Sequence, residues 1–152
     1  MKEMKRILVP VDGSNSACKA VDYAFCLAAK SGAEIDFLYI ANVNAAVGGY
    51  RLANNTCFPQ EVLDSVFKVG EAVLDRIFSR MPEGIKAKRQ VVGGIPTSAI
   101  LEYAEENKAD MIIVGSRGLS MVKGALLGSV SQHLVEYASC PVMVVKENNK
   151  MD

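Results

Sequence analysis

The segment MIIVGSRGLSMVKGALLGSVSQHL, residues 111–134, joins a hydrophobic run to a helical pattern through a loop that contains several glycines. Its first four residues are apolar on both faces, which predicts a buried strand of a parallel sheet. Apolar residues at helical spacing resume after Gly128-Ser129 and predict a helix. A loop between such elements either binds a ligand, phosphate being the first candidate, or is a plain connection.

Outward from this segment, the chain alternates strand patterns with helix patterns. Strands are expected at residues 5–11, 34–40, 85–92, 109–114 and 141–146, and helices at 17–29, 61–80, 97–106 and 129–138. Strands that alternate with helices imply right-handed crossovers and a parallel sheet covered on both faces. The expected fold class is therefore α/β, with the lysine-containing strand at 85–92 on an edge. Residues 41–60 show no clear period, and their role stays open.

Composition narrows the function classes. The 152 residues suit one domain, which we expect at 1–147 with a loose tail at 148–152. Lys+Arg and Asp+Glu are equal at 17 each, so no bulk charge indicates nucleic acid or membrane. The first apolar run is too short for a signal sequence or a bilayer span, which favours the cytoplasm. Four cysteines without a CxxC pair, and a single histidine, indicate free thiols rather than a zinc site.

Two segments of suitable chemistry follow predicted strands and should meet at one rim of the sheet, where ligands bind in open α/β folds. Pro10-Val11-Asp12-Gly13 closes the first strand, and Gly115-Ser116-Arg117-Gly118 closes the fourth. Asp12 precedes Gly13-Ser14, so one interpretation makes it a turn or cap residue. The other interpretation has it contact a base, a ribose or a metal.

The spacing Gly115-x2-Gly118-x9-Gly128-Ser129 supports a phosphate site. We expect Gly115 to let the backbone approach a ligand, Gly118 to permit a positive φ, and Gly128-Ser129 to open a helix whose free amides favour an anion. The hydroxyls of Ser129 and Ser131 are candidate further donors to phosphate oxygens. Under the alternative, the glycines only make turns and caps.

Other chemistry has weaker support in the sequence. Arg117 and Lys123 either screen charge near the loop or face water, and His133 is expected on the flank of the last helix. Neither a Gly-Lys-Ser/Thr loop nor a GxGxxG fingerprint follows any predicted strand, which disfavours P-loop hydrolysis and hydride transfer. The sequence contains no paired carboxylates near the loop and no Cys-His or Ser-His arrangement. It therefore does not indicate an efficient enzyme.

The chain resembles the universal stress protein family in its single-domain form. The resemblance is carried by ILVPVDGS at 7–14, by GIPTSAILEYAEENKADMIIVGSRG at 94–118 and by GALLGSVSQHLVEYASCPVMVVK at 124–146. It spans nearly the whole chain except residues 41–60. The spacing of Gly115, Gly118, Gly128 and Ser129 matches the motif of the ATP-binding branch of that family.

The resemblance implies a three-layer, adenine nucleotide alpha hydrolase-like fold, with a five-stranded parallel sheet in the order 3-2-1-4-5 and four helices. It implies that ATP, or AMP or ADP, binds with Mg²⁺ or Mn²⁺ held by the phosphates. The adenine and ribose would meet Pro10, Val11, Asp12, Ile40, Val114 and Gly115, and the phosphates would meet Gly118, Gly128, Ser129, Val130 and Ser131. It also implies a homodimer formed through the edge strand at 141–145.

The function expected from the resemblance is a nucleotide-dependent regulator of the stress response, with little or no hydrolysis and a protein partner that is unknown. The alternatives are slow ATP hydrolysis or autophosphorylation at Ser129 or Ser131, and a dimeric interaction scaffold that binds no nucleotide. An enzyme acting at an adenylate is disfavoured, because Val11-Asp12-Gly13-Ser14 stands where related enzymes carry a Ser-Gly-Gly-x-Asp-Ser-type loop.

Overall fold

The computed structural model describes residues 2–45, 60–118 and 126–147. In this part of the chain a five-stranded parallel sheet has the order β3-β2-β1-β4-β5. The strands are β1 (Arg6–Pro10), β2 (Glu34–Ala41), β3 (Ala87–Gly93), β4 (Met111–Gly115) and β5 (Val142–Val145), and the helices are α1 (Asn15–Ser31), α3 (Gln60–Ser79), α4 (Pro96–Glu106) and α5 (Ser129–Tyr137). The predicted fold class and strand order are confirmed.

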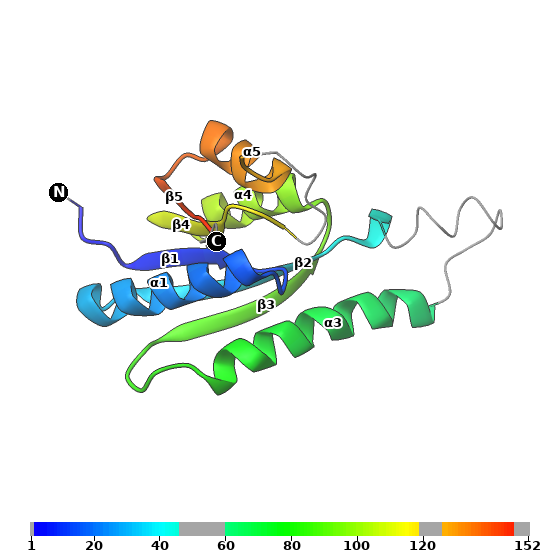
Figure 1. Cartoon of the computed structure of the whole chain (residues 1–152), viewed down its shortest axis with the longest axis horizontal. Coiled ribbons are helices and arrows are strands. Elements are labelled where there is room, and N and C mark those ends of the chain that lie inside the picture. The colour runs from blue at the N-terminus through cyan, green and yellow to red at the C-terminus, as the bar shows by residue number, and fades with distance from the viewer. Residues whose placement is uncertain (1, 46–59, 119–125, 148–152) are drawn as a thin grey trace, which may run out of the picture.

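Two layers of helices enclose the sheet. Helices α1 and α3 pack on one face, and α4 and α5 lie together on the other (Figure 1). Each face has its own hydrophobic core, one around Phe37, Leu74 and Ile113 and the other around Leu38, Ile100 and Leu134. Successive residues of a strand point to opposite faces, so β2 supplies Phe37 to the first core and Leu38 to the second.

Local sequence sets the ends of the helices. The Ser14 hydroxyl caps α1 by accepting from the amide of Ala17, and Gly32 ends that helix with a φ of 73°. Pro96 occupies the first turn of α4, where a missing N–H costs nothing. Helix α1 starts at Asn15, earlier than the expected residue 17, because the Ser14 cap directs the first turn before the apolar period begins.

The two sheet edges differ. At one edge, β3 exposes Lys88, Arg89 and Gln90, as expected for an edge strand that carries charge. At the other edge, β5 is short and apolar, and it pairs with β4 on its inner side. Among the helices of the described ranges, none is both long and apolar enough to span a bilayer.

One carboxylate is buried within the sheet, toward the amino end of β2. Asp36 is 2% exposed, and its Oδ1 has no hydrogen-bond partner among the described residues. Its Oδ2 lies 3.5 Å from the Tyr103 hydroxyl and 3.8 Å from Arg6 Nε. Burial raises the pKa of Asp36 from its ordinary value of 3.8, against the opposing effect of Arg6.

Candidate ligand site at the carboxyl edge of the sheet

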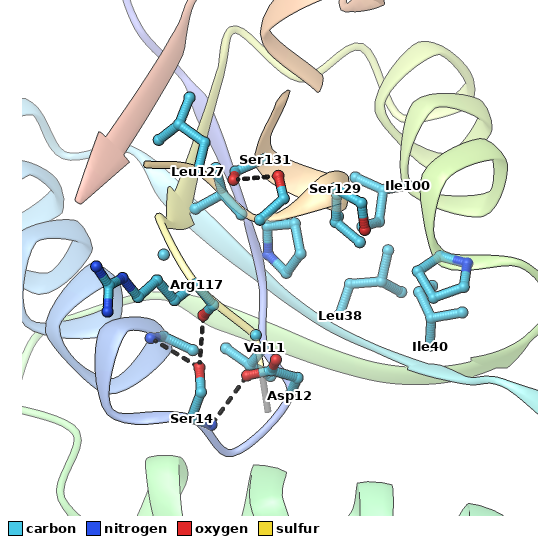
Figure 2. A pocket seen from close by; sticks show the side chains of 18 of the residues that line it. Val11, Asp12, Ser14, Leu38, Ile40, Ile100, Arg117, Leu127, Ser129 and Ser131 are labelled. Atoms are coloured by element: carbon cyan, nitrogen blue, oxygen red, sulfur yellow. Dashed lines mark hydrogen bonds between the residues drawn. The ribbon is translucent and has the colours of Figure 1, made fainter. Parts of the chain in front are cut away.

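A cavity of about 380 Å³ opens where β1, β2 and β4 end and α5 begins (Figure 2). This size lies within the range of small-molecule sites. All eleven residues predicted from the sequence line it: Pro10, Val11, Asp12, Ile40, Val114, Gly115, Gly118, Gly128, Ser129, Val130 and Ser131. The fold therefore brings together segments that are more than one hundred residues apart in the sequence.

One wall of the cavity is apolar. Leu38 and Ile40 lie on one face of β2, and Ile100 of α4 lies beside them (Figure 2). Leu38 is 0% exposed and Ile100 is 2% exposed, so this wall belongs to the second hydrophobic core. Such a surface fits a flat, apolar group.

The start of α5 builds a polar part of the cavity, with Ser129 close to Ile100 in Figure 2. Gly128 is the N-cap, with extended backbone and no side-chain cap. The first helical hydrogen bond runs from the Gln132 amide to the Gly128 carbonyl at 3.0 Å. The amides of residues 129–131 have no acceptor among the described residues, as expected for a helix start that can receive an anion.

Asp12 has one oxygen in a turn and the other at the cavity. Its Oδ1 accepts from the Ser14 amide at 2.9 Å, which makes the turn interpretation correct for that atom. Its Oδ2 lies beside Gly118, at 3.1 Å from the position that a Cβ would take there. Burial raises the pKa of nearby Tyr39, and the negative charge of Asp12 raises it further.

The loop that follows β4 is held from two sides. The hydroxyls of Ser14 and Ser16 both donate to the Arg117 carbonyl, at 3.2 and 2.5 Å. The Ser116 carbonyl accepts from the Gly128 amide at 2.7 Å and from the Ser131 hydroxyl at 3.2 Å. The Ser116 amide in turn donates to the carbonyl of Val145 at 2.8 Å. The first turns of α1 and α5 thus meet at residues 116 and 117.

The structure gives further detail on three of the predicted residues. Gly118 does not have a positive φ, so its backbone does not require glycine. A Cβ on Gly115 would meet Ser16 Oγ at 2.5 Å and the α1 backbone at 2.7 Å, so helix packing by itself requires glycine at this position of the cavity. Ser131 is 2% exposed, and its hydroxyl bonds to the Ser116 and Gly128 carbonyls rather than standing free for a phosphate.

Charged side chains at the described part of the cavity are few. Asp12 and Arg117 are the charged lining residues, and the Arg117 guanidinium points away from the apolar wall (Figure 2). Lys123, the other expected cation, lies outside the described residues. Within the described ranges no three His, Cys, Asp or Glu side chains group as metal ligands. Apart from polar side chains such as Asn42 and Ser129, polar recognition by the described lining therefore rests on main-chain groups.

Several lining residues were missed by the sequence reasoning: Ser14, Ala17, Leu38, Asn42, Pro96, Ile100 and Leu127. Leu38 was detectable, because it lies two positions before Ile40 and so shares its face of the strand. Ile100 carried no such signal, since the rotation of α4 against the sheet depends on packing.

A comparison with protein families matches the universal stress protein family model to residues 3–146. The chain belongs to the universal stress protein family. Universal stress protein MJ0531 of Methanocaldococcus jannaschii is 31% identical over 152 residues, covering 96% of this chain and 84% of that protein.

Solved structures of universal stress proteins show the same fold. The structure of hypothetical protein MJ0577, a universal stress protein of the same organism, has a TM-score of 0.83 and 27% identity and covers 98% of this chain and 100% of its own. A crystal structure of a universal stress protein in complex with cAMP has a TM-score of 0.65 and 28% identity, covering 95% and 98%.

Proposed function

We propose that this universal stress protein binds an adenine nucleotide in the cavity, with ATP as the main ligand and AMP or ADP as further ones. We further propose that it is a nucleotide-dependent regulator of the stress response with little or no hydrolysis. One observation carries the proposal: an apolar wall of Leu38, Ile40 and Ile100 faces the same cavity as the helix start whose amides at 129–131 have no described acceptor.

The two ends of the cavity match the two ends of a nucleotide. A purine is flat and largely apolar, so Leu38, Ile40 and Ile100 would pack against its faces. Phosphate oxygens accept hydrogen bonds, so the amides at the start of α5 would donate to them, helped by the helix dipole. The related universal stress protein crystallised with cAMP, at 28% identity, supports an adenine nucleotide as the class of ligand.

A divalent ion would be held mainly by the phosphates. The described residues contain no preformed group of metal ligands, and Asp12 Oδ2 is the carboxylate oxygen at the cavity. Bound Mg²⁺ or Mn²⁺ would neutralise phosphate charge, which the described lining otherwise meets through main-chain dipoles and Arg117.

Autophosphorylation is the second candidate, and one observation favours Ser129 over Ser131 as its acceptor. Ser129 is exposed and its hydroxyl has no partner among the described residues, whereas the Ser131 hydroxyl is buried and bonded. Asp12 is the one carboxylate among the described lining residues, so a general base would have to be that side chain.

A homodimer through β5 forms part of the proposal, as does an intracellular protein partner that responds to the nucleotide state. The outer edge of β5 pairs with no other strand in the described part of the chain. Its residues Val142, Met143 and Val144 are half-buried in a single chain, so a second copy would cover an apolar edge.

Equilibrium titration tests the nucleotide proposal. ATP, AMP and GTP would be titrated calorimetrically with Mg²⁺ or Mn²⁺ present, and ATP or AMP is expected to bind more tightly than GTP. No binding of ATP or AMP at millimolar concentration would reject the proposal and leave a nucleotide-free scaffold. A radiolabel transferred from ATP to Ser129, and lost in Ser129→Ala, would favour the autophosphorylating alternative.

A further inference from the structure

Ser16 lies behind the cavity wall in the first turn of α1 and does not line the cavity. It is 1% exposed, and its hydroxyl engages both main-chain groups of one loop residue. Ser16 Oγ donates to the Arg117 carbonyl at 2.5 Å and accepts from the Arg117 amide at 3.2 Å. A buried hydroxyl used in both directions fixes the loop backbone more tightly than a single bond would.

Ser16 holds Arg117, and the preceding residue, Ser116, holds the start of α5. The carbonyl of Ser116 accepts from the Gly128 amide at 2.7 Å, and Gly128 is the N-cap of α5. A displacement of the Arg117 backbone would therefore move Ser116 and turn the start of α5. The amides at 129–131 would then point differently into the cavity.

The β2 part of the apolar wall does not depend on this chain of contacts. Leu38 and Ile40 stand on β2, which pairs with β1 and β3, whereas Ile100 of α4 shares the second core with Leu134 of α5. Ser16 makes its side-chain hydrogen bonds to Arg117, which lies at the opposite end of the cavity from these residues (Figure 2). Leu38 and Ile40 are thus positioned by contacts separate from those that hold Arg117.

We infer that Ser16 is a positioning residue for the phosphate end of the cavity: it holds residues 116 and 117 and, through them, orients the amides at the start of α5. This inference rests on the proposed function, because it concerns how that site holds its ligand. It states that the affinity for phosphate depends on Ser16, whereas the affinity for the nucleoside does not.

The test compares Ser16→Ala with Ser31→Ala, using AMP and adenosine as probes in calorimetric titrations. Ser31 is a matched control, because its hydroxyl also donates to a main-chain carbonyl, that of Leu27 at 2.8 Å, but at the far end of α1. Ser16→Ala is expected to weaken AMP binding about fivefold to tenfold, the effect of roughly one hydrogen bond, and to change adenosine binding less than twofold. Ser31→Ala is expected to leave both affinities unchanged.

The outcomes separate the inference from the proposed function. If wild-type protein binds neither AMP nor ATP, the proposed function fails. If wild-type protein binds AMP, two results would overturn the inference and make Ser16 merely structural. Either Ser16→Ala weakens the affinities for AMP and adenosine equally, or it weakens neither affinity.

A second measurement covers the case in which Ser16→Ala does not fold. Hydrogen exchange of the Arg117 amide in wild-type protein is expected to slow when AMP is added, and to slow much less with adenosine. Exchange as fast as in an unstructured peptide, or exchange that AMP does not change, would overturn the inference.

Discussion

Helix α1 approaches β4 so closely that a Cβ on Gly115 would lie 2.5 Å from the Oγ of Ser16. The backbone of Ala17 would be 2.7 Å away, so no rotation of a side chain could relieve the contact. Residue 115 must therefore be glycine. Because glycine leaves this space open, Ser16 can reach the loop that follows β4.

Gly115→Ala is expected to destabilise the protein because α1 must move away from β4. Overpacking of a tight interface costs about 1–3 kcal/mol. Gly118→Ala is the contrast, since its φ is not positive and, among the described residues, its Cβ would meet the Asp12 carboxylate end at 3.1 Å. Urea unfolding of both variants measures the difference, and an equal loss in the two would contradict the packing argument.

Gly128→Val should weaken ATP binding at least about tenfold while the protein remains folded. The extended backbone at Gly128 accepts valine, but the γ-methyl groups would crowd residues 116–118 and the start of α5. Gly128→Ala is the matched control, because its Cβ would meet neighbours at 3.4 Å or more. That variant is expected to retain most of the affinity and to lose at most about 1 kcal/mol of stability. Equal affinities in the two variants would show that this helix start does not contact the ligand.

The buried Asp36 should make the free energy of unfolding fall as the pH rises. Burial raises its folded-state pKa above 3.8, so the folded protein binds the proton more tightly than the unfolded chain does. Stability is then lost as the pH rises from 3.8 through the raised pKa. Asp36→Asn is expected to remove this loss, as denaturation curves at several pH values would show.

Asp110 provides a control of opposite sign. Its carboxylate accepts from Lys2 Nζ and from the amides of Lys5 and Arg6, and these hydrogen bonds lower its pKa. Its stabilisation is present above pH 3.8 and is lost as the pH falls through the lowered pKa. Asp110→Asn should therefore reduce the free energy of unfolding at neutral pH. If Asp110→Asn and Asp36→Asn changed the pH dependence of stability in the same direction, the pKa directions given for Asp36 and Asp110 could not both be right.

Val144→Pro should convert the proposed dimer to a monomer. The carbonyls of Pro141 and Val145 accept from the amides of Ile112 and Ser116, so the alternate residues 142 and 144 turn their main-chain groups to the open edge. Proline at 144 removes an outward N–H and leaves the bonds to β4 in place. Light scattering after size exclusion measures the mass, and a monomeric wild-type protein, or a dimer that persists in the variant, would exclude pairing through this edge.

The features of the fold that the sequence predicts well are those set by neighbouring residues in the chain. Strands β1 and β4 are apolar on both faces, and strands of this kind belong to parallel sheets whatever the rest of the chain does. Asp12 follows β1 and Gly115 ends β4, and parallel strands end at one rim, so their place at the same cavity followed from topology. The positions of Gly118 and Gly128 at the cavity followed from the same reasoning.

The parts missed depend on packing between distant segments. Ser16 looks like an ordinary polar residue of a helix start, and only the contact between α1 and the loop after β4 reveals its bonds to Arg117. Glycine permits a positive φ at Gly118 without requiring it, and the structure does not use that freedom. The Ser131 hydroxyl was assigned to a ligand because its position on α5 does not disclose that Ser116 lies within reach.

The division of the interior into two separate cores has an evolutionary consequence. The apolar wall of the cavity, Leu38, Ile40 and Ile100, draws on the core beneath α4 and α5, whereas α3 packs on the opposite face of the sheet. Substitutions beneath α3 can accumulate without reshaping that wall. Descendants of one ancestral chain can thus diverge on one side of the sheet while they keep the same ligand chemistry on the other.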